Sequence, residues 1–536
     1  PIMPKDKDTE RGGCNHNQQL IGTTMELASL PLLGFLASLL FLLGVTKKIY
    51  TCSAPGDRQP PGPWNLPLLG SLHHVLLSRY RDQPHRALRE LSGRHGPLML
   101  LRLGVVPALV VSSAEGAREV LKTQDTAFAS RHLSPTMEIF TRGGQDIFFA
   151  PYDDLWRQLR RICVLELFST RRVMSFSRIR EEEVATLLRS VADQAGADAD
   201  VEIGALTSRI ITDMVTRSTI GGRCLRRDEF LHEVSKSVKL SAGFNLADLY
   251  PSSKLARWLS GGLRDAERCY RNMRAIMDDI IQERAQATAD ADVESEEDLL
   301  GVLLRLHREG GPLTIDIITT VIVEVLGAGG EASWATLEWA MSELMRNPRV
   351  LHKAQAEVRG MFQGRRQCRL ADGDVLGRLS YLQLVIKETL RLHPPVPFLL
   401  PRQCREPCQL MGYPVPEGTK VLVNAWALGR DAAYWERAEE FEPERFEAAA
   451  MDYKGATNFE YIPFGGGKRM CPGVALSMAN MELLLASLLY HFDWELPVGV
   501  RPEEIDMTEA FGITLQRKTK LVMRATLRIP FDTLVS

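Results

Sequence analysis

The sequence predicts a mainly α-helical protein with small β-sheet regions, in which a single large domain follows a membrane-spanning helix. Residues 27–45 contain no charged side chain. After residue 64 the apolar residues recur mostly at helical spacing, and strand-like pieces such as residues 98–104 and 108–113 are short. No repeat and no change of composition marks a second domain, so one large body is the simplest prediction.

The composition excludes some classes of protein. Among 536 residues, 65 basic side chains balance 67 acidic ones, which gives a net charge of −2 with histidine neutral. This balance argues against a generally basic nucleic-acid-binding protein. The nine cysteines show no C-x-x-C motif and no paired Cys/His spacing. They therefore indicate a reduced compartment rather than a disulfide framework.

The N-terminal region predicts a membrane anchor. We expect residues 1–26, which are polar and aperiodic, to be disordered. Residues 27–46 are long enough to cross nearly all of a hydrocarbon layer of about 30 Å as a helix. A cleaved signal peptide and a buried helix are the alternatives. The apolar run ends at Lys47 and Lys48 without a small-residue cleavage site, which favours a retained anchor.

A basic, proline-rich linker is expected at residues 47–63, ahead of a body that spans residues 64–536. Pro60, Pro61 and Pro63 cannot occupy a helix interior, and they stiffen the chain into an extended form. We therefore expect a stiff arm between the membrane and the body. A simple domain boundary is the plainer alternative.

The segment FGGGKRMCPG, residues 464–473, carries the sharpest chemical signal. Its three consecutive glycines permit backbone turns that are closed to other residues. Cys471 directly precedes an apolar helix pattern, where free N–H groups and the helix dipole favour a thiolate. Arg469 offers a fork of donors suited to a carboxylate. A thiolate beside such a cation predicts a haem site. A glycine loop with an ordinary buried cysteine is the alternative.

This segment resembles the haem-binding loop of the cytochrome P-450 monooxygenases. The resemblance implies that the cofactor is haem b and that Cys471 is the axial ligand of its iron. It also implies that Arg469 binds a haem propionate and that Phe464 contacts the cofactor.

Three further motifs agree with this resemblance. In KETLR and PERF, the family's buried network of one glutamate and two arginines corresponds to Glu388, Arg391 and Arg445. A surface helix pair worth at most about 0.5 kcal/mol is the alternative. In WRQLR, Trp156 and Arg160 match residues that contact the haem propionates in the family. A core tryptophan with a solvated arginine is the alternative there.

The resemblance covers the chain from Pro60 to Ser536. Stretches such as PPGPWNLPLLGSLHH and EEFEPERF resemble plant microsomal members of the family seventy-one group. The resemblance implies an endoplasmic reticulum protein with a single membrane span and a catalytic domain that faces the cytosol. It also implies that one oxygen atom from O2 enters a lipophilic specialised metabolite. The resemblance further implies that the electrons come from NADPH through a flavoprotein reductase. The sequence itself contains no G-x-G-x-x-G motif that opens a helix after a strand.

The substrate class follows less directly from the sequence. A terpenoid is expected, although oximes, phenylpropanoids and indoles are also oxidised in this plant group. Two other functions are compatible with the haem loop. One is a dehydratase or isomerase that acts on an oxime or hydroperoxide without activating O2. The other is a non-catalytic haem-binding protein.

The stretch AGGEAS, residues 328–333, interrupts an apolar helix pattern. Gly329 and Gly330 each cost about 1 kcal/mol relative to alanine inside a helix. In the family this helix passes over the haem, which implies that Gly329 lies at the cofactor in a groove for O2. A local break of the helix there would admit water. Glu331 matches the acid that relays protons, although a buried structural acid paired with a cation is the alternative.

Ala332 departs from the family pattern. It stands where the family usually has a threonine whose hydroxyl takes part in proton delivery. Ser333 is the next hydroxyl, and Thr336 returns to the same face of the helix one turn later. We therefore expect Glu331, Ala332 and Ser333 to determine how protons reach the reaction site.

Substrate contacts are expected from the segments that vary within the family. Most candidates are apolar, which suits a lipophilic substrate oriented by shape. Plain core packing is the alternative for each of them. The candidates are Phe244, Leu246, Val396, Phe398, Leu399, Ile513 and Thr514.

Overall fold

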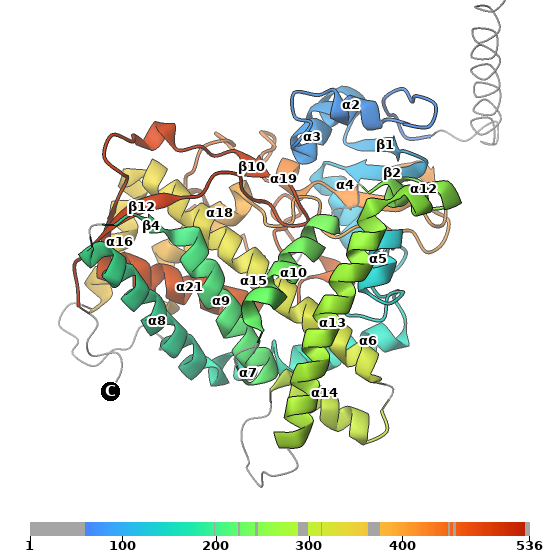
Figure 1. Ribbon diagram of the computed structural model, residues 1–536. Coiled ribbons are helices and arrows are strands. Elements are labelled where there is room, and N and C mark those ends of the chain that lie inside the picture. The colour runs from blue at the N-terminus through green and yellow to red at the C-terminus, as the bar shows by residue number, and fades with distance from the viewer. Residues whose placement is uncertain are drawn as a thin grey trace, which may run out of the picture.

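Helix α15 (Ile315–Arg346) crosses the centre of the molecule (Figure 1). The computed structural model describes residues 59–530 except 198, 223–225, 242–244, 288–297, 312, 363–375, 449–450 and 454–456. The expected N-terminal extension and anchor, and Phe244, lie outside these residues. The N-cap of α15 is Thr314, whose side chain accepts a hydrogen bond from the backbone N–H of Ile317. The apolar residues that follow bury nearly the whole circumference of α15 against other helices.

Three helices pack directly on α15 and form the centre of the core: α9 (Ile203–Ile220), α18 (Ser380–Leu392) and α21 (Val474–His491). Among the described residues, α21 is the one helix that is long and apolar enough to span a membrane by length and composition. However, 72% of its apolar window is buried inside the body. Helix α21 is therefore a core helix.

The remaining helices surround this centre. They are α2 (Leu72–Leu76), α3 (Pro84–His95), α4 (Ala114–Arg118), the π-helix η1 (Glu119–Thr123), α5 (Pro135–Phe140), α6 (Asp154–Glu166), α7 (Thr170–Ser175), α8 (Ser177–Gly196), α10 (Arg227–Leu240), α11 (Leu246–Leu249), α12 (Lys254–Leu259), α13 (Gly261–Ala287), α14 (Leu299–Arg308), α16 (Pro348–Phe362), α19 (Ala425–Leu428), α20 (Arg445–Ala448) and the 3-10 helices η2 (Gly467–Arg469) and η3 (Pro502–Glu504).

The largest sheet has five strands in the order β1-β2-β8-β5-β3. Strands β1 and β2 pair antiparallel where the sequence predicts short strands, while β8 runs parallel to β2. The strands of this sheet are β1 (Leu98–Leu103), β2 (Val106–Val111), β3 (Ser130–Arg131), β5 (Arg402–Gln403) and β8 (Lys420–Val423). Three small sheets add β4 (Val201–Glu202) with β12 (Val522–Leu527) and β9 (Phe492–Glu495), β6 (Cys408–Leu410) with β7 (Tyr413–Val415), and β10 (Glu509–Ala510) with β11 (Gln516–Arg517). The predicted mainly α class with small β regions is confirmed.

The proline-rich segment packs on the edge of the five-stranded sheet. The backbone N–H of Leu100 donates to the carbonyl oxygen of Pro61 at 2.8 Å. A Cβ on Gly62 would meet the carbonyl oxygen of Leu100 at 2.1 Å, so only glycine permits this approach. Pro60 and Pro63 are buried. The end of the arm is therefore part of the packed body, and it covers the edge of β1.

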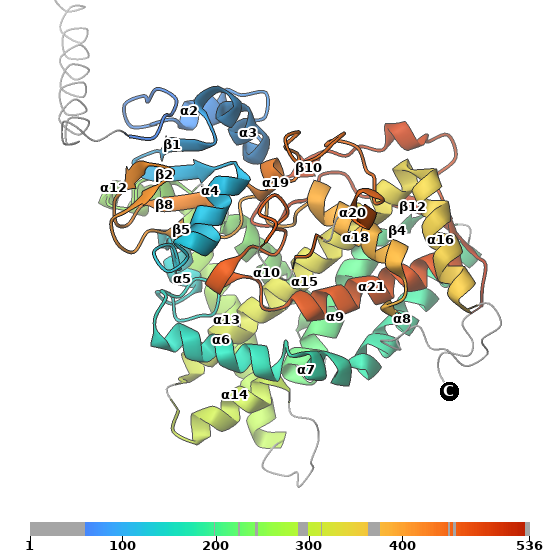
Figure 2. The same cartoon turned by 180° about the vertical axis from the view of Figure 1, so that it is seen from behind.

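The elements that position the site meet on one face of the molecule. Figure 2 shows α6 and α21 on the face opposite to α13, which lies in front in Figure 1. The loop before α21 joins α6 through a hydrogen bond from Arg160 Nη2 to the carbonyl oxygen of Met470 at 2.5 Å. Helix α15 is fastened to α21 by the hydroxyl groups of Ser333 and Ser477, whose oxygens are 3.4 Å apart. The cysteine loop therefore lies between α6 and α15.

Candidate active site

Cys471 lies at the end of a tight loop directly before α21. Gly465 (φ 72°) and Gly467 (φ 65°) adopt left-handed backbone conformations. A Cβ on Gly467 would lie 2.3 Å from the carbonyl oxygen of Leu121, so no other residue fits there. The loop closes where the backbone N–H of Cys471 donates to the carbonyl oxygen of Phe464 at 2.9 Å. The glycines thus allow the chain to turn and present the thiol at the start of the helix.

The electrostatics of this thiol differ from the prediction in one respect. Burial raises the pKa of Cys471, while the backbone N–H of Gly473 and the positive charge of Arg160 oppose that rise. The helix entrance therefore favours the thiolate as expected, but desolvation outweighs it in the protein alone. A thiolate that ligates a metal ion is stabilised by the metal itself.

Arg469 lies against the cysteine loop with one nitrogen unused. Its Nε donates to the carbonyl oxygen of Ala129 at 2.7 Å, and its Nη2 donates to that of Ala150 at 2.5 Å. The guanidinium carbon lies 4.1 Å from the centre of the Trp156 ring. Nη1 is buried and has no hydrogen-bond partner among the described residues. Because a buried unsatisfied donor is costly, this nitrogen requires an acceptor.

Three more guanidinium groups surround Arg469: those of Arg131, Arg160 and Arg402. Burial and the charges of Arg402 and Arg160 together lower the pKa of Arg469 to about 9, against the opposing charge of Asp146. Burial also lowers the pKa of Arg131 well below its usual value, and Arg402 and Arg469 add to that effect. Arg402 forms an ion pair with Asp125 at 3.5 Å, and Asp146 and Asp153 act on Arg469. The four guanidinium groups still outnumber these carboxylates, so the cluster suits further anionic partners.

The residues present therefore fit a haem group. Haem carries two propionate carboxylates, which the free nitrogen of Arg469 and the excess positive charge suit. Its iron accepts a thiolate, which Cys471 offers. Arg131 and Arg402 were not predicted from the sequence. Strand pairing places them opposite each other in β3 and β5, and residue spacing carries no signal of that contact.

Trp156 and Arg160 lie one turn apart on α6, as their spacing predicts. The indole Nε1 of Trp156 donates to the carbonyl oxygen of Ile147 at 2.9 Å. Arg160 is half-buried and lies 5.5 Å from the Trp156 ring. The alternative of a core tryptophan with a solvated arginine therefore fits Trp156 but not Arg160. The indole packs against Arg469 and so supports the arginine cluster.

The two glycines of AGGEAS face another helix. A Cβ on Gly329 would lie 3.1 Å from Val215 Cγ1, and one on Gly330 would lie 3.5 Å from Thr212 Oγ1. Both of these partners belong to α9. The predicted local break is wrong, because α15 is an unbroken α-helix through this stretch. Close packing of α9 on α15 explains the missing side chains. A contact between the backbone of Gly329 and the cofactor stays a prediction.

Glu331 is poised to exchange a proton near neutral pH. Burial raises the pKa of Glu331 to about 7, while a hydrogen bond from Gln516 and the more distant charge of Lys239 act in the opposite direction. The amide Nε2 of Gln516 donates to Glu331 Oε1 at 2.5 Å. Its direct partner is thus an amide in β11, which the sequence analysis did not identify. A carboxyl that titrates near 7 suits proton transfer.

The hydroxyl groups near Ala332 already donate hydrogen bonds to carbonyl oxygens of their own helix. Ser333 Oγ donates to the carbonyl oxygen of Gly329 at 3.1 Å, and Thr336 Oγ1 donates to that of Ala332 at 2.8 Å. Both side chains are buried, at 2% exposure. Each oxygen can still accept a hydrogen bond, but neither offers a free proton while these bonds hold.

A pair of buried carboxyl groups lies beside the arginine cluster and was not predicted. Asp146 Oδ1 accepts hydrogen bonds from the backbone N–H groups of Phe149 (2.6 Å) and Ala150 (2.7 Å). Its carboxyl group also contacts that of Glu324 on α15. Burial, together with the neighbouring Asp146, raises the pKa of Glu324 well above its usual value. The proximity of the two carboxyl groups therefore favours a protonated form of the pair and ties this loop to α15.

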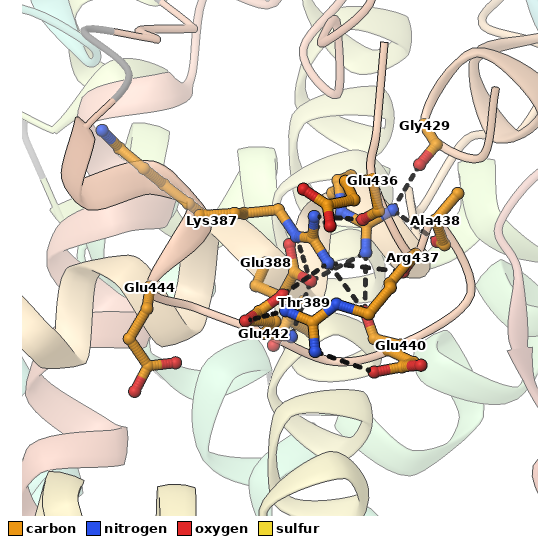
Figure 3. A network of polar contacts seen from close by, with 12 residues as sticks. Lys387, Glu388, Thr389, Gly429, Glu436, Arg437, Ala438, Glu440, Glu442 and Glu444 are labelled. Atoms are coloured by element: carbon orange, nitrogen blue, oxygen red, sulfur yellow. Dashed lines mark hydrogen bonds and ion pairs between the residues drawn. The ribbon is translucent and has the colours of Figure 1, made fainter. Parts of the chain in front are cut away.

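Glu388, Arg391 and Arg445 form a buried network. Figure 3 shows Glu388 within the polar contacts that link it to Gly429 and Ala438. Arg391 Nε and Nη2 each donate to one carboxylate oxygen of Glu388 at 2.7 Å, and Arg445 Nε donates to Oε1 at 2.9 Å. Arg391 Nη1 donates to the carbonyl oxygens of Gly429 (2.5 Å) and Ala438 (2.7 Å). The side chains of Glu388 and Arg391 are fully buried. The network thus fastens α18 to the segment that leads to α20, and the surface-pair alternative is wrong.

Four of the predicted substrate residues line one partly open cavity: Val396, Phe398, Leu399 and Ile513. Leu399 has a φ of 53°, an uncommon backbone conformation for such a residue. Its Cδ1 lies 3.9 Å from the position that a Cβ on Gly465 would take, so the cavity adjoins the cysteine loop. Of the other candidates, Thr514 is buried and Leu246 is 42% exposed. Neither of these two is part of the cavity wall.

A thiol presented beside a cluster of guanidinium groups, under a long central helix, defines a haem-thiolate protein. The family model "Cytochrome P450" matches residues 60–523. The chain belongs to the cytochrome P450 family. It is an oxidoreductase, a monooxygenase that holds haem through a cysteine thiolate and acts on a lipophilic substrate with O2.

Similar plant proteins cover nearly the whole chain. Dolabradiene monooxygenase from Zea mays is 48% identical over 91% of this chain and 96% of its own. Ent-isokaurene C2/C3-hydroxylase from Oryza sativa subsp. japonica is 48% identical over 89% and 94%. Premnaspirodiene oxygenase from Hyoscyamus muticus is 44% identical over 94% and 99%. These relatives give no support to the dehydratase, isomerase or non-catalytic alternatives.

A solved structure shows the same fold. A zebrafish cytochrome P450 solved with abiraterone has a TM-score of 0.68 and 26% identity, over 83% of this chain and 99% of that one.

Proposed function

We propose that this protein inserts one oxygen atom from O2 into a plant terpenoid, with Cys471 as the thiolate ligand of the haem iron. The arrangement of Cys471 beside the unsatisfied nitrogen of Arg469 carries the proposal. The terpenoid class is supported by the names of the relatives, which include oxygenases and hydroxylases of dolabradiene, ent-isokaurene and premnaspirodiene. The mostly apolar cavity suits such skeletons.

The proposed substrate class is tested with the reconstituted enzyme, a plant reductase and NADPH. The panel contains olefinic sesquiterpenes and diterpenes, with oximes and phenylpropanoids as the comparison set. Mass spectrometry of the products is expected to show a gain of one oxygen on terpenoids. Turnover of oximes alone, with loss of water, would overturn the proposal.

Bound haem supplies the activation of O2 when electrons arrive. The chain's own residues hold the haem, keep it oriented and supply protons. Arg469 would hold one propionate through Nη1, and Arg131 and Arg402 would balance the remaining negative charge. Trp156 keeps the Arg469 guanidinium in place beneath its ring. Glu331 holds the proton that is delivered from the α15 side, because its pKa lies near 7.

The electrons come from NADPH through a separate flavoprotein reductase. The support for this part of the proposal is the charge on α6. One side of this helix reaches the cysteine loop through Arg160. On its outer surface Arg161 is exposed beside Arg157, and Arg157 pairs with Asp154. A basic surface next to the thiol suits an acidic partner, because complementary charge orients an encounter complex.

Threonine at position 332 is expected to improve the use of NADPH. Since Ser333 and Thr336 donate to helix carbonyl oxygens, Ala332 leaves this turn without a free hydroxyl proton. We expect Ala332→Thr to raise the ratio of product to NADPH consumed about twofold or more and to lower peroxide release. Ala332→Val is the control, because valine has the shape of threonine without the hydroxyl. A loss of product in both variants would show instead that Ala332 makes room for the substrate.

We also propose that the body faces an endoplasmic reticulum membrane, with residues 27–46 as its anchor and the catalytic domain in the cytosol. Large apolar side chains support this orientation: Leu77 is 84% exposed, Trp258 72% and Leu255 64%. They belong to α12 and to the end of α2, which lie at the same end of the molecule (Figure 1). Tyr250 joins the two regions, since its hydroxyl donates to the carbonyl oxygen of Leu68 at 3.0 Å.

Charging this apolar end is expected to release a truncated protein from membranes. In a chain without residues 1–48, Leu77→Glu combined with Trp258→Glu should reduce the membrane-bound fraction, because charged side chains do not enter the lipid interface readily. Flotation with liposomes measures this fraction. Val498→Glu is the matched control, since Val498 is 89% exposed but lies elsewhere, after β9. An equal effect of the control would contradict the proposed orientation.

A further inference from the structure

The cavity beside the cysteine loop has a polar wall that a purely apolar substrate does not use. Most of its lining residues are aliphatic, aromatic or proline. The polar exceptions are His132, Ser134, Ser241 and Lys420. Lys420 carries the one ammonium group in this wall.

Strand geometry directs the Lys420 side chain toward the cavity. Lys420 and Leu422 alternate with Val421 and Val423 along β8, so the two pairs face opposite sides of the sheet. Leu422 lines the same cavity as Lys420, whereas Val421 and Val423 belong to a separate apolar cluster of the core.

The ammonium group lacks a direct partner. The ammonium group of Lys420 forms no hydrogen bond or ion pair with the described residues. Asp248 on α11 is the acid whose charge acts on it. However, the oxygens of Asp248 already accept from the backbone N–H of Thr136 (3.0 Å) and from its hydroxyl (2.9 Å). Lys420 is half-buried at the cavity wall. A partly desolvated cation without a direct counter-charge is unfavourable, so the site suits an added anion.

The protonation states of Lys420 and His132 at neutral pH are consistent with a site for an anion. Burial lowers the pKa of Lys420 to about 8, and Asp248 opposes that shift. Burial and the charge of Lys420 together lower the pKa of His132 to about 4. At pH 7 the lysine is therefore still mostly charged, while the imidazole is neutral and able to share a hydrogen bond.

We propose that Lys420 and His132 form an anion-binding subsite in the substrate cavity, and that the natural substrate carries a carboxylate on an apolar skeleton. The proposal rests on the proposed function and names a polar group of its substrate. One ammonium balances one carboxylate, whereas a phosphate would bury additional negative charge. Leu399 marks the end of the cavity near Gly465, so a carboxylate held at Lys420 leaves the skeleton to extend toward the cysteine loop.

Matched acids and esters test the subsite. The probes are abietic acid with methyl abietate and lauric acid with methyl laurate, and equilibrium dialysis at pH 7 against the haem-loaded protein measures the dissociation constants. At least one acid should bind about tenfold more tightly than its ester. Lys420→Met should reduce this ratio to about one, while Lys420→Arg should retain most of it. Lys518→Met, at an exposed position outside the cavity, should leave it unchanged.

The pH dependence provides a second test that needs no variant. Because the ammonium is lost as pH rises through about 8, acid binding should weaken between pH 7 and pH 9.5 while ester binding stays constant. No preference for either acid, a ratio that persists to pH 9.5, or an equal loss for acid and ester in Lys420→Met would overturn the subsite. If the wild type oxygenates no terpenoid yet prefers acids, the proposed function fails and the subsite stands.

Discussion

Replacement of Cys471 by alanine is expected to abolish both oxygenation and the thiolate-type absorption band of the reduced carbon monoxide complex. Haem binding itself should weaken but persist in part, because Arg469 and the surrounding guanidinium groups still suit the propionates. The loop should keep its shape, since the hydrogen bond between Cys471 and Phe464 involves only backbone atoms. The measurement is the carbon monoxide difference spectrum together with the haem content of the purified variant.

Cys408→Ala is the control for this experiment. Cys408 is half-buried in β6. That variant should keep the wild-type spectrum. A thiolate-type band that survives in Cys471→Ala would show that Cys471 is not the ligand. A band lost in Cys408→Ala would show that the ligand lies in β6 and not in the Cys471 loop.

The second large effect is expected at Glu388. Its carboxylate accepts from Arg391 through two nitrogens and from Arg445 through a third. Glu388→Ala removes the counter-charge of the fully buried Arg391 guanidinium, while Arg445 keeps a longer ion pair with Glu442 at 3.4 Å. Breaking a buried ion pair in this way costs about 3–5 kcal/mol of folding free energy. We expect a large fall in the thermal unfolding midpoint and poor haem incorporation.

A surface pair provides the matched comparison. Glu504 bonds Arg501 at 2.8 Å, and both side chains are largely exposed. Glu504→Ala should leave the unfolding midpoint and the haem content unchanged, because exposed pairs contribute little. A Glu388→Ala protein with wild-type unfolding and haem content would show that the network is not needed for the haem-binding body.

Local patterns explain which parts of the molecule were predictable. Residues 98–113 form two short strands because β-favouring apolar residues flank a turn with a glycine, Gly104. Glu388 and Arg391 lie on one helix face because they are three residues apart. The Cys471 loop depends on glycines and a helix start that lie next to one another in the chain. In each case the residues that act together are close in sequence.

Contacts between distant segments account for most of what the sequence missed. Arg131 and Arg402 meet through strand pairing across more than 250 residues. Glu324 and Asp146 meet because α15 crosses the loop before α6, and Gln516 reaches Glu331 from the C-terminal region. A single sequence gives no signal of such pairings.

The glycines of AGGEAS show a different limit of sequence reasoning. The two glycines predict a less stable turn of the helix and a local break that admits water. The structure instead keeps α15 whole and uses the missing side chains of Gly329 and Gly330 for the approach of α9. A pattern of small residues indicates a close approach, but it does not identify what approaches.

Turnover of the terpenoid panel under ¹⁸O2, with NADPH and a reductase, shows whether this protein transfers an oxygen atom from O2 to a lipophilic substrate. We expect a product that carries one ¹⁸O atom and is not formed without oxygen. Product formed in the absence of O2, or oxygen that derives from ¹⁸O-labelled water, would contradict this expectation.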